Sequence, residues 1–149
     1  MEFIKINNTN SYKLKNIISL DIYQNVIEKI NKGELDVYAI DNSNKIIGRL
    51  FVNYINGTLD NETIFGKRVY ISYFFLKDEY RNKGLGTKLL DYTLKDLKEK
   101  GYTEFTVGVE EKNEIAKHIY FKYGFTKAID YGKGDDFDPT EYTLYLKTL

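Results

Sequence analysis

The spacing of apolar residues along the chain predicts alternating strands and helices. Residues 1–6 alternate enough between apolar and polar side chains to form a first strand. From residue 11 to residue 32 the apolar residues recur at helical spacing, which predicts one amphipathic helix that ends at Gly33. The first half of the chain then continues with a strand at residues 35–40, a turn at 41–44, a strand at 46–55 and a polar loop at 56–67.

The second half opens with the longest apolar run, residues 69–76, which is β-branched and aromatic almost throughout. Such a continuous run predicts a central strand covered on both faces. An amphipathic helix follows and extends to Lys100. The remaining elements are a strand at 103–109, a helix at 114–123, a strand at 125–131, an acidic loop at 132–140 and a strand at 142–146. The order β-α-β-β-β-α-β-α-β-β predicts a single α/β domain, residues 1–149, with helices packed on a twisted sheet.

Composition excludes several classes of function. The 149 residues carry a formal net charge of zero, which argues against a general binder of nucleic acid or membrane surfaces. The chain has no cysteine and only one histidine, His118, so it lacks a thiolate nucleophile and a cysteine or histidine metal cluster. No apolar run is long enough for a signal peptide or a membrane span. We therefore expect a cytoplasmic domain without a metal, nucleic-acid or membrane partner.

Two glycines, Gly84 and Gly86, stand between the long apolar strand and the helix that ends at Lys100. A strand, a glycine turn and a helix start bring free backbone N–H groups and the positive end of the helix dipole together, which favours an anion. The string is not a P-loop, and Leu89 occupies the position where a dinucleotide fingerprint needs its third glycine. Taken alone, the two glycines are compatible with a plain turn or with a phosphate site.

The residues around these glycines match a known pattern. Arg81-x-x-Gly84-x-Gly86 resembles the acetyl-CoA pyrophosphate motif of the GNAT superfamily of N-acetyltransferases. The preceding residues 76–81 resemble that family's approach to the motif, with Asp78 in place of a common proline. A second motif of the family is matched at Asn113, Ala116, Ile119, Tyr120, Gly124 and Phe125. The resemblance is strong from about residue 69 to residue 125.

The resemblance implies a mostly antiparallel twisted sheet of about six or seven strands, flanked by helices. A splayed central strand pair would form the slot for acetyl-CoA, and an N–H group of the strand would polarise the thioester carbonyl. The residues that the resemblance assigns to acetyl-CoA binding are Phe74, Phe75, Leu76, Arg81, Asn82, Lys83, Gly84, Leu85, Gly86, Thr87, Asn113 and Tyr120. Lys88 would add positive charge nearby, and no metal is implied.

Tyr120 matches the family's general acid, which returns a proton to the departing sulfur. A phenol with a pKa of about 10 can protonate a thiolate whose thiol has a pKa of about 8.5, and it keeps its proton at neutral pH. The alternative is a core aromatic residue, and Tyr123 or Tyr73 could be confused with Tyr120 in the catalytic role. Asn113 would bond the pantetheine, a role compatible with capping the following helix. His118, two residues before Tyr120, should face away from it.

The attacking amine must lose a proton, and the sequence does not name the base. Many family members carry a carboxylate at the position of Gly108, which has no side chain. Glu110 is our candidate base and Glu111 is the other nearby carboxylate, although acids at these positions also suit a helix start. Deprotonation through ordered water is an equal alternative.

The implied function is transfer of an acetyl group from acetyl-CoA to a primary amine of a small molecule or peptide, by direct attack in a ternary complex. One alternative is a catalytically weak acyl-CoA sensor or interaction module. Another is a transferase that moves a longer acyl group or that acylates an oxygen atom of the acceptor. Acceptor choice would come from the first helix, the loop at 56–67 and the final hairpin, and a homodimer through the sheet edge or final strands fits the family. Five acids would attract a cationic acceptor if their loop overhangs the slot: Asp130, Asp135, Asp136, Asp138 and Glu141. The alternative is a solvated loop whose Asp and Gly residues serve turns alone.

Overall fold

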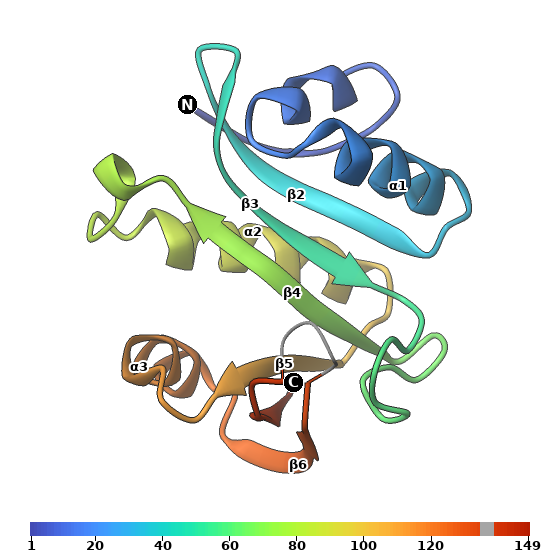
Figure 1. The fold of residues 1–149 in the computed structure, drawn as a ribbon, viewed down its shortest axis with the longest axis vertical. Helices are drawn as coiled ribbons and strands as arrows, with labels where there is room; N and C mark the ends of the chain where they lie inside the picture. The colour runs from blue at the N-terminus through green and yellow to red at the C-terminus, as the bar shows by residue number, and fades with distance from the viewer. Residues whose placement is uncertain (135–138) are drawn as a thin grey trace.

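The computed structural model describes residues 1–134 and 139–149 and contains one seven-stranded sheet (Figure 1). The strands lie in the order β1-β2-β3-β4-β5-β7-β6, so the chain adds strands sequentially until β7 inserts between β5 and β6. The strands are β1 Glu2–Lys5, β2 Leu35–Asn42, β3 Lys45–Asn53, β4 Arg68–Leu76, β5 Glu104–Glu110, β6 Lys127–Gly132 and β7 Tyr142–Thr148.

Three α-helices and two short 3₁₀ helices connect the strands, in the order predicted from the sequence. The helices are η1 Ser11–Asn16, α1 Leu20–Asn31, η2 Asp78–Tyr80, α2 Leu85–Glu99 and α3 Glu114–Tyr123. The prediction of one helix over residues 11–32 was wrong, because Ser19 adopts an extended backbone that separates η1 from α1. The break lets Leu14 of η1 and Val26 of α1 reach the same core from different directions.

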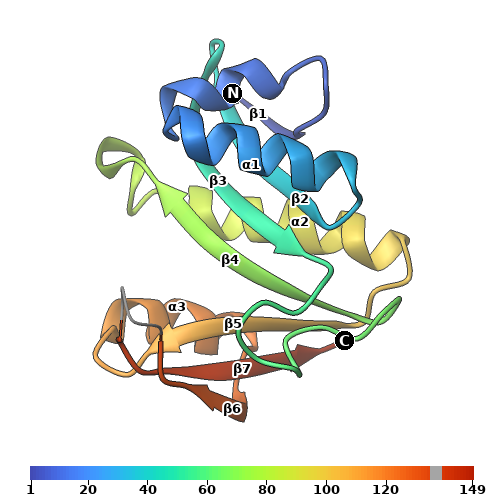
Figure 2. The same cartoon turned by 45° about the vertical axis from the view of Figure 1, so that its right-hand side comes forward.

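The helices cover the two faces of the sheet and enclose two separate apolar cores (Figure 2). On one face, α2 and α3 pack against the middle strands through a core that includes Leu90 and Phe105. On the other face, η1 and α1 cover β1, β2 and β3 through a core that includes Leu14 and Phe51. None of the helices in the described residues is long and apolar enough to cross a membrane.

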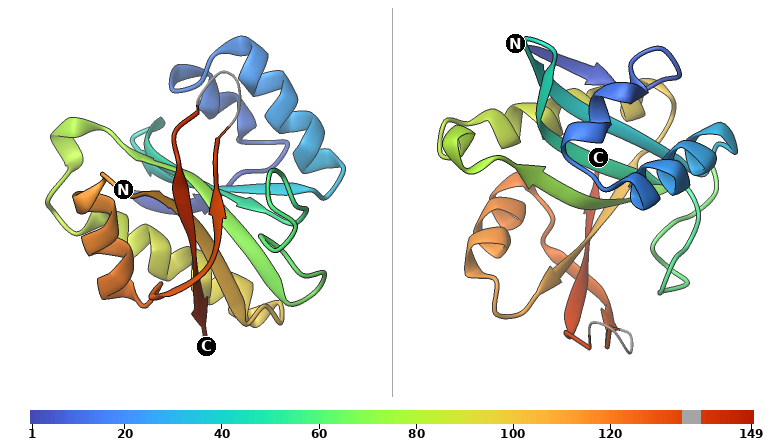
Figure 3. Two further views of the ribbon diagram at one scale, coloured as in Figure 1. Left: turned by 60° about the horizontal axis from the view of Figure 1, so that its bottom comes forward. Right: turned by 45° about the horizontal axis from the view of Figure 1, so that its top comes forward.

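The sheet opens between its two central parallel strands. β4 pairs with β5 only from Arg68 to Ile71, opposite Glu104 to Val107, and beyond these residues the two strands diverge (Figure 3). β3 continues to pair with β4 on one side of the opening, and β7 pairs with all of β5 on the other. The splayed central pair implied by the family resemblance is therefore confirmed.

β4 is the central strand, but the prediction that both of its faces are covered was only partly right. Val69 and Ile71 are buried in the core under α2 and α3. From Ser72 onward the residues are half-buried or exposed, because the strand has left its pairing with β5. An apolar run on a central strand can thus line an opening as well as fill a core.

Two leucines provide a test of the core. Leu90 of α2 is fully buried, whereas Leu20 at the start of α1 is 62% exposed. We expect Leu90→Ala to lower the free energy of unfolding by about 2–5 kcal/mol, because it leaves a cavity. Leu20→Ala should change it by less than about 1 kcal/mol. Urea unfolding followed by circular dichroism measures both, and equal losses would contradict the placement of α2 over the core.

Candidate active site

The loop between β4 and α2 presents a run of free backbone donors. The N–H groups of residues 82–87 have no hydrogen-bond acceptor among the described residues. Asn82 and Gly84 have φ angles of 62° and 77°, a left-handed conformation that turns the loop into the helix. Because these donors sit at the positive end of α2, the loop has the properties of an anion site. The sequence-predicted residues Asn82 to Thr87 are thus brought together.

Arg81 braces this loop from its outer side. Its Nε donates to the Leu76 carbonyl at 2.9 Å, and its Nη1 pairs with Asp78 at 2.9 Å. The ammonium group of Lys83 lies 5.9 Å from the centre of the Tyr80 ring. Asp78, which replaces the family's common proline, therefore holds Arg81 in place across the turn.

A bulge in β4 decides which of two neighbouring phenylalanines faces the helices. Tyr73 and Phe74 together stand opposite Leu50 of β3, and Tyr73 has a φ angle of 50°. Phe74 points toward α2 and α3. Its ring lies so close to Gly86 of α2 that a Cβ added there would be 3.3 Å away, and its ring centre is 6.4 Å from that of Tyr120 in α3. Phe75 lies on the other face, where its ring centre is 5.1 Å from the Arg49 guanidinium. Phe74, not Phe75, thus faces Tyr120.

Arg49 of β3 stabilises the bulge. Its Nη1 donates to the Tyr73 carbonyl at 2.5 Å, and its guanidinium lies 5.5 Å from the centre of the Phe51 ring. A residue with positive φ that is not glycine costs energy, so such a conformation needs support from its surroundings. Sequence reasoning missed Arg49, because only the strand register places it beside the bulge.

Tyr120 of α3 packs at the mouth of the splay. Its ring meets Phe74 and Phe125 edge-on, with ring centres 6.4 Å and 5.6 Å apart. Burial raises the pKa of Tyr120 to about 12. The phenol therefore stays protonated at neutral pH, as a proton donor must.

Asn113 caps α3 and also lines a cavity at the splay between β4 and β5. Its Oδ1 accepts a hydrogen bond from the Ala116 N–H at 3.0 Å, so the capping role is confirmed. His118 is exposed on α3 and is absent from the cavity wall.

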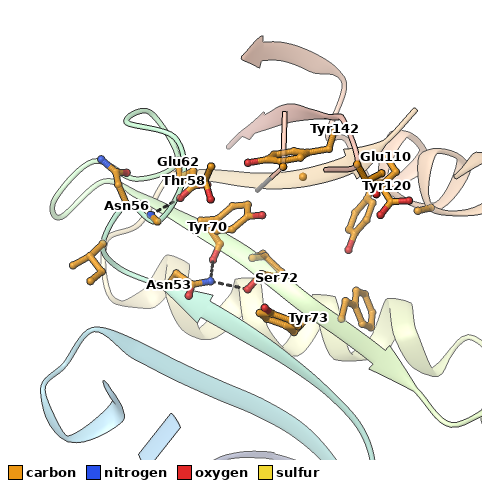
Figure 4. Close-up of a pocket in the computed structure, with 18 of the residues that line it drawn as sticks. Asn53, Asn56, Thr58, Glu62, Tyr70, Ser72, Tyr73, Glu110, Tyr120 and Tyr142 are labelled. Carbon is orange, nitrogen blue, oxygen red and sulfur yellow. Dashed lines mark hydrogen bonds between the residues drawn. The ribbon is translucent and has the colours of Figure 1, made fainter. Parts of the chain in front are cut away.

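A cavity of about 640 Å³ extends from the splay across the face of β4 (Figure 4). Tyr120, Phe74 and Asn113 line it at the splayed end. Glu110, at the end of β5, lies beside Tyr120 at the same end. The rest of the wall comes from β3, the loop at 56–67, β5 and the final hairpin, with Asn53, Asn56, Thr58, Glu62, Tyr70 and Tyr142 among the lining residues. The amide of Asn53 fixes one wall, since its Nδ2 donates to the Tyr70 carbonyl at 3.0 Å and to Ser72 at 2.8 Å.

The space that a side chain on residue 108 would fill is already occupied. A Cβ on Gly108 would lie 3.0 Å from the Tyr70 hydroxyl and 3.0 Å from the Tyr142 ring. Burial, followed by the charge of Glu62, raises the pKa of Tyr70. The missing carboxylate at this position is thus replaced by a phenol that stays protonated.

The two candidate bases have different environments. Glu110 is exposed and lines the cavity. Glu111 accepts a hydrogen bond from Thr143 and pairs with Lys117 at 2.9 Å. The Thr143 hydroxyl first, and then Lys117, lower the pKa of Glu111. The carboxylate of Glu111 therefore links Thr143 of β7 to Lys117 of α3.

Glu62 is a cavity carboxylate that sequence reasoning missed. It is only 2% exposed, and its Oε1 accepts from the Gly57 N–H at 2.7 Å. Nothing in the local sequence separates it from Asp60 in the same polar loop. Of the acids predicted to attract a cationic acceptor, Asp135, Asp136 and Asp138 lie outside the described residues. Asp130 lies in β6, where its Oδ1 accepts from the Tyr131 N–H, and it is not among the described residues that line the cavity.

No group of three or more His, Cys, Asp or Glu side chains that could hold a metal ion occurs within residues 1–134 and 139–149. The features that the described site does provide are an anion loop, a split strand pair, a buried phenol and a cavity for a second molecule.

Solved structures with the same fold span nearly the whole chain. An aminoglycoside 6'-N-acetyltransferase complexed with coenzyme A matches with a TM-score of 0.75 and 14% identity, over 99% of this chain and 97% of that chain. A ribosomal-protein-alanine N-acetyltransferase from Brucella melitensis matches with a TM-score of 0.76 and 14% identity, over 100% of both chains. A GNAT family acetyltransferase from Elizabethkingia anophelis with acetyl-CoA bound matches with a TM-score of 0.70 and 16% identity, over 99% and 97%. At these identities the likeness is one of fold.

Comparison with curated proteins finds no match. The family model described as "Acetyltransferase (GNAT) family" matches residues 6–125, which include the splay, the anion loop and Tyr120. The chain therefore belongs to the GNAT acetyltransferase family.

Proposed function

We propose that this protein transfers an acetyl group from acetyl-CoA to a primary amine. The observation that carries the proposal is the continuity of the site: one cavity joins the splayed end of β4, Tyr120 and an acceptor region lined by carboxylates. Solved relatives of the same fold contain coenzyme A or acetyl-CoA, which supports the choice of acyl donor. Acetyl-CoA supplies an activated thioester, and this chain's residues position it.

The residues fit such a donor. The free N–H groups of residues 82–87 are proposed to hold its pyrophosphate, because hydrogen bonds to a charged acceptor are strong. The pantetheine arm is proposed to pair with the edge of β4 from Phe74 to Leu76, which β5 has left free. Asn113 lines the same cavity and adds a polar contact.

Transfer needs one new bond and one broken bond. The neutral amine attacks the thioester carbonyl, the C–N bond forms and the C–S bond breaks. An N–H group of β4 polarises the carbonyl oxygen. Tyr120 gives its proton to the departing sulfur, and Glu110 or water takes the proton that the amine loses. A catalytically weak acyl-CoA sensor is the competing function, favoured by the absence of a carboxylate at Gly108.

The first experiment measures free-thiol release from acetyl-CoA by the purified protein, against a panel of polyamines, aminoglycosides, amino acids and lysine peptides. We expect release that depends on one class of amine. Acetyl-CoA binding in calorimetry without release would establish the sensor function instead.

Removal of the proposed acid tests the mechanism. Tyr120→Phe keeps the ring contacts with Phe74 and Phe125 but removes the hydroxyl, so turnover should fall by about tenfold or more. The dissociation constant for acetyl-CoA should change little, because the anion loop is untouched. Steady-state kinetics and calorimetry separate the two effects, and unchanged turnover would exclude Tyr120 from proton transfer.

The pH dependence of turnover tests the state of the same group. Because the pKa of Tyr120 is raised to about 12, its proton is retained as the pH increases through the working range. The acceptor amine, with a pKa of about 10, loses its proton over the same range. Turnover should therefore rise from about pH 7 to about pH 9. A fall in this range that disappears in Tyr120→Phe would contradict the assignment.

Two glycines at opposite ends of α2 provide a test variant and a matched control for anion binding by the loop. Gly84 and Gly101 both have positive φ, 77° and 98°, and a Cβ on either would meet nothing within 4 Å. Gly84→Ala and Gly101→Ala should each cost roughly 1 kcal/mol of stability from backbone strain. Only Gly84→Ala should weaken acetyl-CoA binding, by about tenfold, since its methyl group enters the approach to the free N–H groups. Calorimetry would refute the phosphate site if both variants bound equally.

A further inference from the structure

The cavity contains a buried carboxylate without a countercharge. Glu62 is 2% exposed and lines the cavity, and the Gly57 N–H donates to its Oε1. Within the part of the chain that the structure describes, no Lys, Arg or His lies at ion-pair distance from Glu62. Buried carboxylates are normally paired, because loss of hydration is costly for a charge. A cation from outside the chain that enters the cavity would supply this countercharge.

The backbone around Glu62 holds this carboxylate in place. The Thr106 hydroxyl donates to the Glu62 carbonyl at 2.8 Å, which fastens the loop to β5. The Thr63 N–H donates to Asn56 Oδ1 at 2.8 Å, which closes the loop on itself. These two bonds fix the backbone of the loop on either side of Glu62, and the Gly57 N–H holds the side chain itself.

The surroundings of Glu62 are aromatic and acidic. Figure 4 draws it beside Thr58 and next to Tyr70, and Tyr142 lines the same part of the cavity. Burial, followed by the charge of Glu62, raises the pKa of both phenols, which agrees with a carboxylate close to them. Glu34 and Glu110 add negative charge, and Lys29 is the one basic side chain in the described wall. Such a cavity attracts cations.

Glu62 lies away from the splayed end of the cavity. Its neighbour Tyr70 precedes Phe74 by four positions on β4, and one of these is taken up by the bulge. Three strand rises correspond to roughly 10 Å. The amine that is acetylated must be neutral beside Tyr120, so a cation at Glu62 belongs to a different group of the acceptor.

We propose that Glu62 binds a second ammonium group of the acceptor, so that the substrate carries at least two amino groups. One is held at Glu62, and the other is presented to the acetyl donor at the splayed end. This inference rests on the proposed function and names its substrate class. Glu62 acts here as a specificity residue and takes no part in bond making.

Diamine binding can be measured without turnover. Octamethylenediamine is titrated by calorimetry into the protein saturated with coenzyme A, which carries no acetyl group. We expect Glu62→Gln to weaken this binding by about tenfold or more. Glutamine keeps the acceptor for the Gly57 N–H and removes only the charge. Glu99→Gln, on the exposed end of α2, makes the same change in net charge away from the cavity and should leave binding unchanged.

Stability and kinetics give two further readouts. Glu62→Gln should melt at a higher temperature than the wild type, because it removes an unpaired buried charge. The value of kcat/KM should fall for octamethylenediamine but not for octylamine, whose single amino group must lie at the splayed end to react. Glu62→Asp retains the charge at a shorter reach and should fall between the wild type and Glu62→Gln.

The outcomes separate this inference from the proposed function. Equal diamine binding by the wild type and Glu62→Gln, or no diamine binding by the wild type, overturns the role of Glu62. An equal loss of kcat/KM for octylamine and the diamine also overturns it. Diamine binding that depends on Glu62, without acetyl transfer to any amine, supports the ammonium site at Glu62 and refutes the transferase proposal.

Discussion

The architecture of this protein depends on the end of hydrogen bonding between β4 and β5. The two strands pair over only four positions and then diverge, although each keeps its partner on the outer side. Backbone groups at the inner edges of the opening are left for another molecule to satisfy. Phe74 and Tyr120 pack against each other at the mouth, so aromatic contact occupies part of the space that strand pairing would otherwise close. The opening is thus a built feature of the sheet.

Several costs are concentrated around this opening. Tyr73 has a positive φ angle. Within the described residues, the buried Nε of Arg49 has no hydrogen-bond partner and the buried carboxyl group of Glu62 has no basic side chain at ion-pair distance. Two cores on opposite faces of the sheet supply the stability that offsets these costs. Proteins commonly retain such unfavourable groups where binding needs them. Two of these energetically unfavourable residues, Tyr73 and Glu62, line the cavity, which agrees with its assignment as the binding site.

The local devices of the site follow directly from residue type. A glycine with positive φ before α2, an asparagine cap before α3 and an apolar stripe along α2 are short-range patterns, so the sequence predicts them and the structure confirms them. The order of strands and helices was predicted for the same reason. The prediction of a single helix over residues 11–32 was wrong. Ser19 has an extended backbone that separates η1 from α1, and the spacing of apolar residues does not reveal this break because both helices contribute to the same core.

By itself, the sequence predicted the order of the elements and the glycine turn before α2, since each depends on neighbours within a few residues, and the family resemblance named Tyr120 as the candidate acid. Only the tertiary structure decided which phenylalanine faces Tyr120, because a bulge opposite Leu50 shifts the alternation of β4. It also showed that Glu111 is bound to Lys117, that Tyr70 and Tyr142 fill the space beside Gly108, and that Glu62 is buried in the cavity wall. These contacts join residues far apart along the chain, and side-chain surroundings of that kind are set by strand register and loop packing, which no local pattern encodes.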